Sequence, residues 1–311
     1  MRTALTWAAT SGQAESGLRL AAALGLFWLV HGDYSEGCTR LATLLNQPGA
    51  TTPPSGATRA TALHWAGALA YYQGDYPASR VLLKESLPLR RQAGEKPVDE
   101  RGIAETLVWL ACLDDSQQEY FPARDLLEDA LQTAQQAQDK HGYAFALMGM
   151  GELLRLEGDV VAARALYEQS LALYRELGDK RQVAVGLMNL GLVALRERDS
   201  RHAATFFKEA LVLATELDNK YYTASCLAYA AAVRALRNEL HPTAQLFGAA
   251  EAHLAALGTV MEAADRIEVD HHIDLARDTL GPAAWADSYR IGQAMSLNEA
   301  IAYAMAETDD S

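Results

Sequence analysis

The chain has 311 residues, half of them hydrophobic, and a formal net charge of −13 at neutral pH. This length and apolar content are sufficient to bury an extended core. A strongly acidic surface repels a phosphate backbone, so direct binding of nucleic acid is disfavoured. The three cysteines, Cys38, Cys112 and Cys226, form no close pair, which argues against a disulfide framework and against a CxxC metal site.

The main pattern along the chain is a repeat with a period near 40 residues. Small residues recur at separations of 42, 44, 40, 40 and 41, at Gly25, Gly67, Ala111, Gly151, Gly191 and Ala232. A second small residue follows twelve positions after each of them, at Gly37, Ser79, Ala123, Ala163, Ala203 and Ala244. Because self-similarity at a fixed period marks a repeat architecture, the sequence predicts six helical hairpins rather than one globular domain.

Each predicted hairpin contains a turn between its two helices. The clearest turns are Gly32-Asp33, Gly74-Asp75 and Gly158-Asp159. Glycine can adopt the left-handed conformation that ends a helix, and aspartate can cap the next helix by accepting a bond from its free N–H groups. The pattern predicts a leading helix and a first hairpin over 1–46, loops at 47–56 and at about 94–100, and hairpins as far as residue 257.

The pattern changes after Gly258. The segments 260–280 and 283–306 are predicted to form two or three helices, with starts at Pro282 and at Ser296, whose Glu299 completes a capping box. We expect these helices to cover the apolar end of the last repeat. The predicted organisation is therefore a repeat array over 1–257, followed by capping helices and a polar tail over 258–311.

The small residues, with a bulky residue four positions after the second of each pair, resemble the tetratricopeptide repeat (TPR) pattern. The bulky positions are Leu41, Leu83, Leu127, Tyr167, Phe207 and, as a departure from the pattern, Gly248. A period near 40 exceeds the 34 residues typical of this repeat, so helices or turns must be longer here. The resemblance implies an all-α fold: a right-handed superhelical solenoid of about six TPR-like hairpins with a C-terminal helical cap.

Both ends of the chain are similar to a narrower group. Near the start these segments are Leu5-Thr6-Trp7-Ala8, Gly17-Leu18-Arg19-Leu20-Ala21 and Phe27-Trp28, and near the end they are Ala244-Gln245-Leu246-Phe247-Gly248-Ala249-Ala250-Glu251, Trp285 and Met295-Ser296-Leu297. They resemble the C-terminal TPR sensor and interaction region of bacterial STAND-type ATPases and LuxR-type transcriptional regulators. The resemblance implies a sensor or protein-interaction arm, with ATPase and DNA-binding domains upstream in the full-length protein.

Catalytic and metal-binding patterns are poor. The chain has no Gly-Lys dipeptide, so it has no GxxxxGK[ST] phosphate loop. The densest group of potential ligands is Asp270-His271-His272-Ile273-Asp274, but adjacent histidines point about 100° apart on a helix and the HExxH spacing is missing. The apolar run Leu18–Val30 is too short to span a bilayer. We therefore expect a cytoplasmic chain that is not an enzyme and uses no metal and no cofactor.

The TPR resemblance implies a binding groove, because the first helix of each TPR hairpin lines the inner wall of the superhelix. The residues at the usual inner positions are His64, Tyr71, Val108, Cys112, Asp115, Met148, Glu152, Arg155, Met188, Leu192, Arg196, Tyr229, Val233 and Arg237. The groove is expected to take a protein or peptide, or a small inducer. Met148 and Met188 replace the polar residues of the clamp with which some TPR domains hold a C-terminal carboxylate, which disfavours a chaperone-tail receptor.

Two features of this set have two interpretations each. Arg155, Arg196 and Arg237 recur at intervals of 41, so they form either a row of guanidiniums for an acidic peptide or an anionic ligand, or helix-end cations that pair with acids of the next unit. Met148, Met188 and Tyr229 form either an adaptable stripe for a bound peptide or part of the core.

Two classes of function remain open on this sequence. In the first, ligand binding in the groove regulates an attached ATPase or effector. In the second, the chain is a stand-alone TPR scaffold or adaptor that assembles protein complexes. An enzyme built on a helical array is a third class, with no catalytic motif in its favour.

Overall fold

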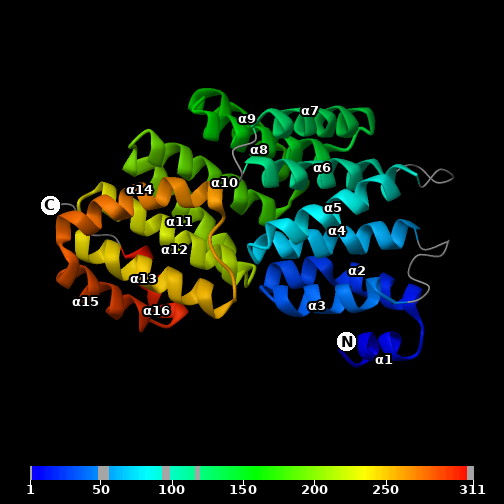
Figure 1. The fold of residues 1–311 in the computed structure, drawn as a ribbon. Coiled ribbons are helices and arrows are strands. Elements are labelled where there is room, and N and C mark those ends of the chain that lie inside the picture. The colour runs from blue at the N-terminus through cyan, green and yellow to red at the C-terminus, as the bar shows by residue number, and fades with distance from the viewer. Residues whose placement is uncertain (1, 48–55, 93–98, 116–119, 307–311) are drawn as a thin grey trace. The chain divides into compact units, whose positions relative to one another are not determined.

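The computed structural model describes residues 2–47, 56–92, 99–115 and 120–306 (Figure 1). Over these residues the structure contains sixteen helices and no strand, which confirms the predicted all-α repeat fold. The helices are α1 (Arg2–Thr10), α2 (Ala14–His31), α3 (Tyr34–Leu45), α4 (Gly56–Tyr72), α5 (Tyr76–Arg91), α6 (Glu100–Asp115), α7 (Tyr120–Gln136), α8 (Lys140–Glu157), α9 (Val160–Leu177), α10 (Lys180–Arg196), α11 (Ser200–Glu216), α12 (Lys220–Leu236), α13 (Leu240–Ala256), α14 (Ala263–Leu280), α15 (Pro282–Gln293) and α16 (Leu297–Met305). Most of the loops predicted at 47–56 and 94–100 lie outside the described residues.

The chain divides into two compact units, Met1–Glu157 and Gly158–Ser311. The first unit contains α1 to α8 and the second contains α9 to α16. The division between these units falls between the repeat helices α8 and α9. The predicted boundary between the repeat array and the capping helices, after residue 257, stays a prediction. Repeat helices α9 to α13 and the C-terminal helices α14 to α16 belong to the same unit.

Side-chain caps set the start of many helices. The capping residues accept a hydrogen bond from the backbone N–H three positions further on, and they are Asp75, Asp159, Asp179, Asp199 and Asn219. Asp33 was expected to cap in the same way but makes no side-chain cap bond to α3. Each of the five cap bonds that do form satisfies one of the N–H groups that the first turn of a helix leaves without a partner.

Several turns between helices contain a residue with positive φ, and this residue is not always glycine. Gly32, Gly74 and Gly158 have φ values of 74°, 76° and 95°, as the sequence pattern predicts. Four other residues adopt the same region one position before a helix-capping position, namely Gln138, Arg198, Asp218 and Asn238, with φ of 55°, 61°, 50° and 62°. A side chain in this region is strained, so the packed helices impose the conformation of the turn rather than the residue in it.

The small and bulky positions of the repeat meet inside the hairpins. The bulky residues Leu41, Leu83, Leu127, Tyr167 and Phe207 are at most 2% exposed. A Cβ atom on Gly191 would overlap the Phe207 ring, and one on Gly67 would overlap the Leu83 side chain. The predicted bulky positions of the first five repeats are therefore confirmed as core positions.

A repeated ion pair joins the second helix of one hairpin to the end of the next first helix. Arg124 on α7 pairs with Glu157, which ends α8. Arg164 on α9 pairs with Glu197, the residue after α10. Both members of the second pair lie forty residues after those of the first, so the pair follows the helix period.

The C-terminal helix α15 packs against α13, the second helix of the last hairpin. Gly248 on α13 and Gly292 on α15 lie at this contact, where an added Cβ on Gly248 would overlap the Tyr289 carbonyl and one on Gly292 would overlap the Gln245 carbonyl. The backbones therefore approach too closely for a side chain at either glycine. The expected departure from the bulky pattern at Gly248 is wrong, because the helices start forty residues apart and the position that corresponds to Phe207 is Phe247, which is 2% exposed. The predicted helix starts at Pro282 and Ser296 are confirmed, and Ser296 forms a capping box with Glu299.

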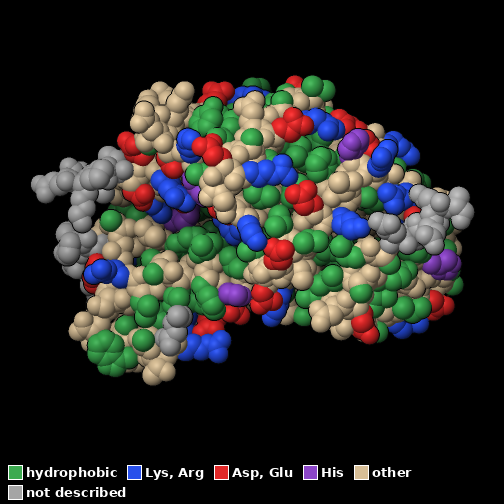
Figure 2. All heavy atoms as spheres, turned by 180° about the vertical axis from the view of Figure 1, so that it is seen from behind, with side chains coloured by type: hydrophobic (Ala, Val, Ile, Leu, Met, Phe, Trp, Pro, Cys, Tyr) green, Lys and Arg blue, Asp and Glu red, His purple; other side chains and the backbone are tan. Residues whose placement is uncertain are grey.

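Charged groups of both signs are interspersed on the face shown in Figure 2, rather than separated into areas of one sign. No helix in the described part of the chain is both long and apolar enough to cross a membrane. Among the described residues, which include 270–274, no group of three or more His, Cys, Asp or Glu side chains could hold a metal ion.

Candidate ligand-binding site

Most of the predicted groove residues of the first unit are buried. His64, Tyr71, Val108 and Met148 are 2–5% exposed, and Arg155 is fully buried. Side chains this deep pack between the first helices and cannot touch a ligand without a rearrangement. For Met148, burial favours core packing over the peptide-stripe interpretation.

Two further residues of the predicted set are accessible in the first unit. Cys112 and Glu152 are partly exposed on α6 and α8. Asp115 ends α6, but its side chain lies outside the described residues. The accessible part of the predicted set is therefore small.

A polar cluster links the first helices α4, α6 and α8. The Nδ1 atom of His64 lies 3.0 Å from the Thr106 hydroxyl, and its Nε2 atom lies 3.9 Å from the Glu105 carboxylate. His141 on α8 lies 3.8 Å from the same carboxylate. Burial, and then the charge of Arg90, lower the pKa of His64 well below its ordinary value of 6.5. Although Glu105 is near, burial dominates, and His64 is neutral.

Aromatic side chains form a second connection across the first unit. We call Tyr72, Trp109 and Phe145, on α4, α6 and α8, the aromatic row. Ring centroids lie 5.8 Å apart between Tyr72 and Trp109, and 6.1 Å apart between Trp109 and Phe145. Trp109 and Phe145 are partly exposed. The predicted set missed this row, although Trp65 and Trp109 each stand two residues before the small residue of their repeat.

In the second unit, the first helices are covered by the chain itself. The helix α14 packs on α12 and reaches α10 (Figure 1). Arg196 on α10 donates to Glu268 on α14, with 3.0 Å between Nη1 and Oε1, and the Tyr229 hydroxyl on α12 donates to the Asp265 carboxylate. Burial, and then Asp265, raise the pKa of Tyr229 well above its ordinary value. The C-terminal helices thus cover first-helix faces as well as the end of the last repeat, which is more than the sequence predicted.

The other predicted residues of the second unit differ in exposure. Met188, Leu192, Tyr229 and Val233 are at most 6% exposed, so they also pack in the core. Arg237 is exposed, and its Nη2 donates to the Ser200 carbonyl over 3.3 Å.

The three arginines at intervals of 41 are not equivalent positions. The helices of this region start forty residues apart, at Val160, Ser200 and Leu240. Arg237 therefore corresponds to Glu197, whereas Arg196 lies one residue earlier in its repeat. Arg155 is buried. Arg196 pairs with an acid, which agrees with the helix-end interpretation, but that acid is Glu268 on α14 and not a residue of the next repeat unit.

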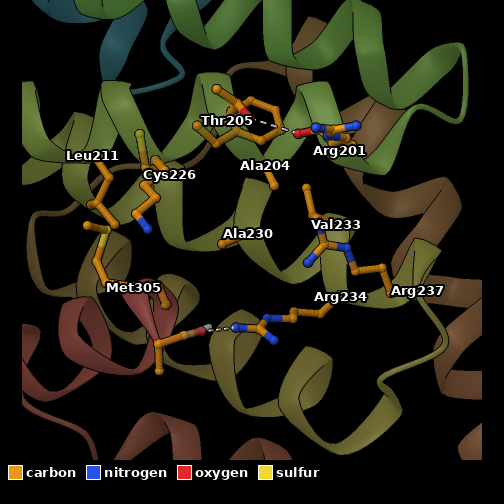
Figure 3. Close-up of a pocket in the computed structure, with 14 residues that line it drawn as sticks. Arg201, Ala204, Thr205, Leu211, Cys226, Ala230, Val233, Arg234, Arg237 and Met305 are labelled. Carbon is orange, nitrogen blue, oxygen red and sulfur yellow. Dashed lines mark hydrogen bonds between the residues drawn. The ribbon is translucent and has the colours of Figure 1, made fainter. Parts of the chain in front are cut away.

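A cavity of about 430 Å³ lies in the second unit, between α11, α12 and the end of α16 (Figure 3). Its lining residues are Arg201, Ala204, Thr205, Phe207, Lys208, Leu211, Cys226, Ala230, Val233, Arg234, Arg237, Ala304, Met305 and Ala306. Val233 and Arg237 belong to the predicted set. Burial raises the pKa of the Cys226 thiol, so this cysteine is a poor nucleophile.

The cavity opens where the repeated ion pair is interrupted. Forty residues after Arg164 and Glu197, the same two positions hold Ala204 and Arg237. Alanine is shorter than the arginine of the preceding repeat, and arginine replaces the acid. Both residues line the cavity, so at this repeat the lining has a small side chain at one position and a cation in place of an acid at the other.

Four of the lining residues are cationic, and of the described residues that line the cavity none is acidic. Arg234 is 7% exposed and is held by Glu239 and by the Ala306 carbonyl, each at 2.6 Å. Figure 3 shows Arg201 and Arg237 on one side of the cavity and Leu211, Cys226 and Met305 on the other, whereas the Arg234 guanidinium extends toward Ala306, next to Met305. We call the side with Arg201 and Arg237 the basic end and the side with Leu211, Cys226 and Met305 the apolar end.

Part of the chain matches a known repeat family. Residues 102–176 and 142–216 match the family described as Tetratricopeptide repeat, and together they make up less than half of the chain. No curated protein matches the sequence.

Three solved structures share the fold at low sequence identity. A Rap protein complexed with Competence and Sporulation Factor is 14% identical, with a TM-score of 0.62 over 94% of this chain and 76% of that chain. The Rap conjugation gene regulator of the plasmid pLS20, in complex with the Phr* peptide, is 12% identical, with a TM-score of 0.55 over 91% and 76%. BtubC from P. vanneervenii is 15% identical, with a TM-score of 0.51 over 75% and 92%. Residues 102–216 are thus similar to tetratricopeptide repeats, and the chain has the fold of a TPR-like helical repeat array.

Proposed function

We propose that this chain is a non-catalytic module that binds a peptide or a protein segment through the first helices of its first unit. The observation that carries the proposal is the aromatic row of Tyr72, Trp109 and Phe145, which continues from helix to helix with two partly exposed rings. Two of the solved structures with this fold are complexes, one with Competence and Sporulation Factor and one with the Phr* peptide. These complexes support a peptide as the ligand.

Aromatic rings suit this role because they offer a large contact area at a low cost in side-chain entropy. Apolar side chains of a peptide can pack against the exposed edges of Trp109 and Phe145, and aromatic residues commonly dominate binding energy at interfaces. The accessible Glu152 on α8 and Cys112 on α6 belong to the same first helices.

The first unit is favoured over the second as the peptide site, because in the part of the chain that the structure describes the faces of its first helices are not covered by a C-terminal helix of the same unit. In the second unit α14 occupies the faces of α10 and α12. Within the first unit, the described helices that contact α4, α6 and α8 are their neighbours in the array. A peptide therefore needs to displace no helix of that unit to reach the aromatic row.

We place this module as the regulatory sensor arm of a multidomain signalling ATPase or transcriptional regulator. The resemblance of both chain ends to such proteins supports this context. A stand-alone adaptor is the second candidate, and the exposed apolar residues near the N-terminus favour it. Trp7, Leu26 and Phe27 are 44–60% exposed and offer a surface for a second protein.

The test selects peptides from a displayed random library on the full chain and measures the affinity of synthetic copies by calorimetry. Phe145→Ala and Trp109→Leu are expected to weaken binding at least tenfold. Phe121→Ala is the matched control, because Phe121 is 87% exposed on α7 and lies outside the aromatic row. Circular dichroism establishes that each variant is folded. A library that yields no binder, or peptides that bind the row variants as tightly as wild type, would refute the proposal.

A further inference from the structure

We propose that the cavity between α11, α12 and α16 binds a small amphipathic anion, with a carboxylate or phosphate at the basic end and a short apolar body at the other end. This site is separate from the aromatic row, and it adds a small-molecule ligand to the proposed peptide binding. It rests on the charge, shape and origin of the cavity in the second unit.

The lining of the cavity is basic, in contrast to the acidic chain as a whole. The whole chain has a net charge of −13, yet four cations and no acidic side chain line the cavity among its described residues. Arginine offers several N–H donors in a planar fork that fits carboxylate and phosphate oxygens. Arg237 is exposed and lies on the same side of the cavity as Arg201 (Figure 3), so the donors that it does not give to the Ser200 carbonyl are accessible to an anion.

The volume of the cavity and its apolar end suit a small ligand with an apolar part. A cavity of about 430 Å³ lies within the range of small-molecule sites, roughly 300–1,000 Å³. Leu211, Cys226 and Met305 gather at the end away from Arg201 and Arg237 (Figure 3). An uncharged ligand would not use the charges of Arg201 and Arg237, and a purely inorganic one would leave the apolar end without a contact.

The ion pair of the preceding repeat is absent at the two positions that line the cavity, Ala204 and Arg237. The preceding repeat fills the same position with Arg164 and neutralises it with Glu197. Ala204 has a short side chain where the preceding repeat has Arg164. Arg237 is positively charged where the preceding repeat has the negatively charged Glu197. Both changes favour an external anion at this repeat over an internal salt bridge.

The test titrates the full chain with four probes by calorimetry: octanoate, octyl phosphate, octanol and inorganic phosphate. Octanoate or octyl phosphate is expected to bind at least tenfold more tightly than octanol or inorganic phosphate, and to weaken as salt rises. The stronger of the two distinguishes a carboxylate from a phosphate ligand. Octanol binding as tightly as both anions, or no binding of any probe, overturns the proposal.

Three variants assign the binding to this cavity. Arg237→Gln is expected to weaken the preferred anion at least fivefold, whereas Arg290→Gln, which removes an exposed arginine of α15 outside the cavity, leaves the affinity unchanged. The double variant Ala204→Arg/Arg237→Glu rebuilds the pair of the preceding repeat and is expected to abolish binding without loss of thermal stability. Unchanged affinity in a folded double variant overturns the proposal. Peptide binding at the aromatic row should survive in all three variants, so failure here and failure of the proposed function are separate results.

Discussion

Arg196 and Glu268 form an ion pair that joins a first helix of the repeat array to the C-terminal helix α14. The pair has 3.0 Å between Nη1 and Oε1, and the Glu268 side chain is 10% exposed. It is separated by 72 residues in the sequence. The docked position of α14 therefore depends on a long-range contact that lies partly out of water.

Replacement of Glu268 by Gln should loosen α14. Removing one partner of a partly buried pair leaves the other with an unfavourable environment, so we expect a loss of about 1–2 kcal/mol in the free energy of unfolding. Urea denaturation measures the loss, and faster amide exchange over 264–280 locates it. Asp287→Asn is the control, since Asp287 and Arg290 form a pair with both side chains more than 70% exposed, and its effect should be near zero. Equal effects of the two substitutions would contradict the role of Glu268.

Two glycines test the close packing of helices. Gly292→Ala should cost about 1–3 kcal/mol, because the new Cβ meets the Gln245 carbonyl on α13 and backbone cannot yield easily. Gly186→Ala should be neutral or stabilise by up to about 1 kcal/mol, because the nearest atom is the flexible end of Leu171, 3.3 Å away, and alanine favours a helix. Thermal unfolding of both variants checks the prediction. A neutral Gly292→Ala variant would show that α13 and α15 are not in such close contact.

The positive-φ turns offer a stabilising substitution. Gln138 has φ of 55°, where a Cβ is strained and glycine is not. Gln138→Gly should therefore raise the free energy of unfolding by about 0.5–1 kcal/mol. The same change at Gln132, an exposed position inside α7, should lower it by about 1 kcal/mol. If chemical denaturation gives the same sign for both, the turn conformation is not as described.

Stability should depend on pH through His64. Its pKa in the folded chain lies well below 6.5, with burial as the main cause, whereas the unfolded chain has the ordinary value. The unfolded state therefore binds more protons below about pH 6.5, and stability falls as the pH decreases through that range. His64→Asn should remove up to one proton from this dependence, about 1.4 kcal/mol per pH unit. The measurement is the slope of unfolding free energy between pH 7 and 5, and identical slopes would show that His64 is not buried as a neutral group.

Local periodicity made much of the fold predictable. Residues such as Leu127 and Phe207 lie a fixed number of positions after small residues, and the same spacing recurs because each hairpin solves the same packing problem. The capping box of Ser296 and Glu299 is equally local, since a segment of four residues, 296–299, contains the whole signal. Elements with a period or a short motif were therefore found from the sequence.

Contacts without a period were not predictable in this way. Nothing near Arg196 in the sequence indicates that Glu268 reaches it, and the occupation of α10 and α12 by α14 follows from such contacts. Ala230, Ala231 and Ala232 offered several choices of small residue, and choosing Ala232 shifted the register by one, so Arg237 was aligned with Arg196 rather than with Glu197. Because of that shift, neither the interrupted ion pair nor the cavity beside it was predicted from the sequence.

The central claim is that a peptide binds to the first helices of the first unit. Amide hydrogen exchange of the full chain, with and without a library-selected peptide, tests it most directly. We expect slower exchange in α6 and α8, around Trp109 and Phe145, with α10 and α12 unchanged. Protection confined to α10 and α12, with α14 exchanging faster, would contradict peptide binding at the first unit, because the peptide would then have displaced α14 from the second unit.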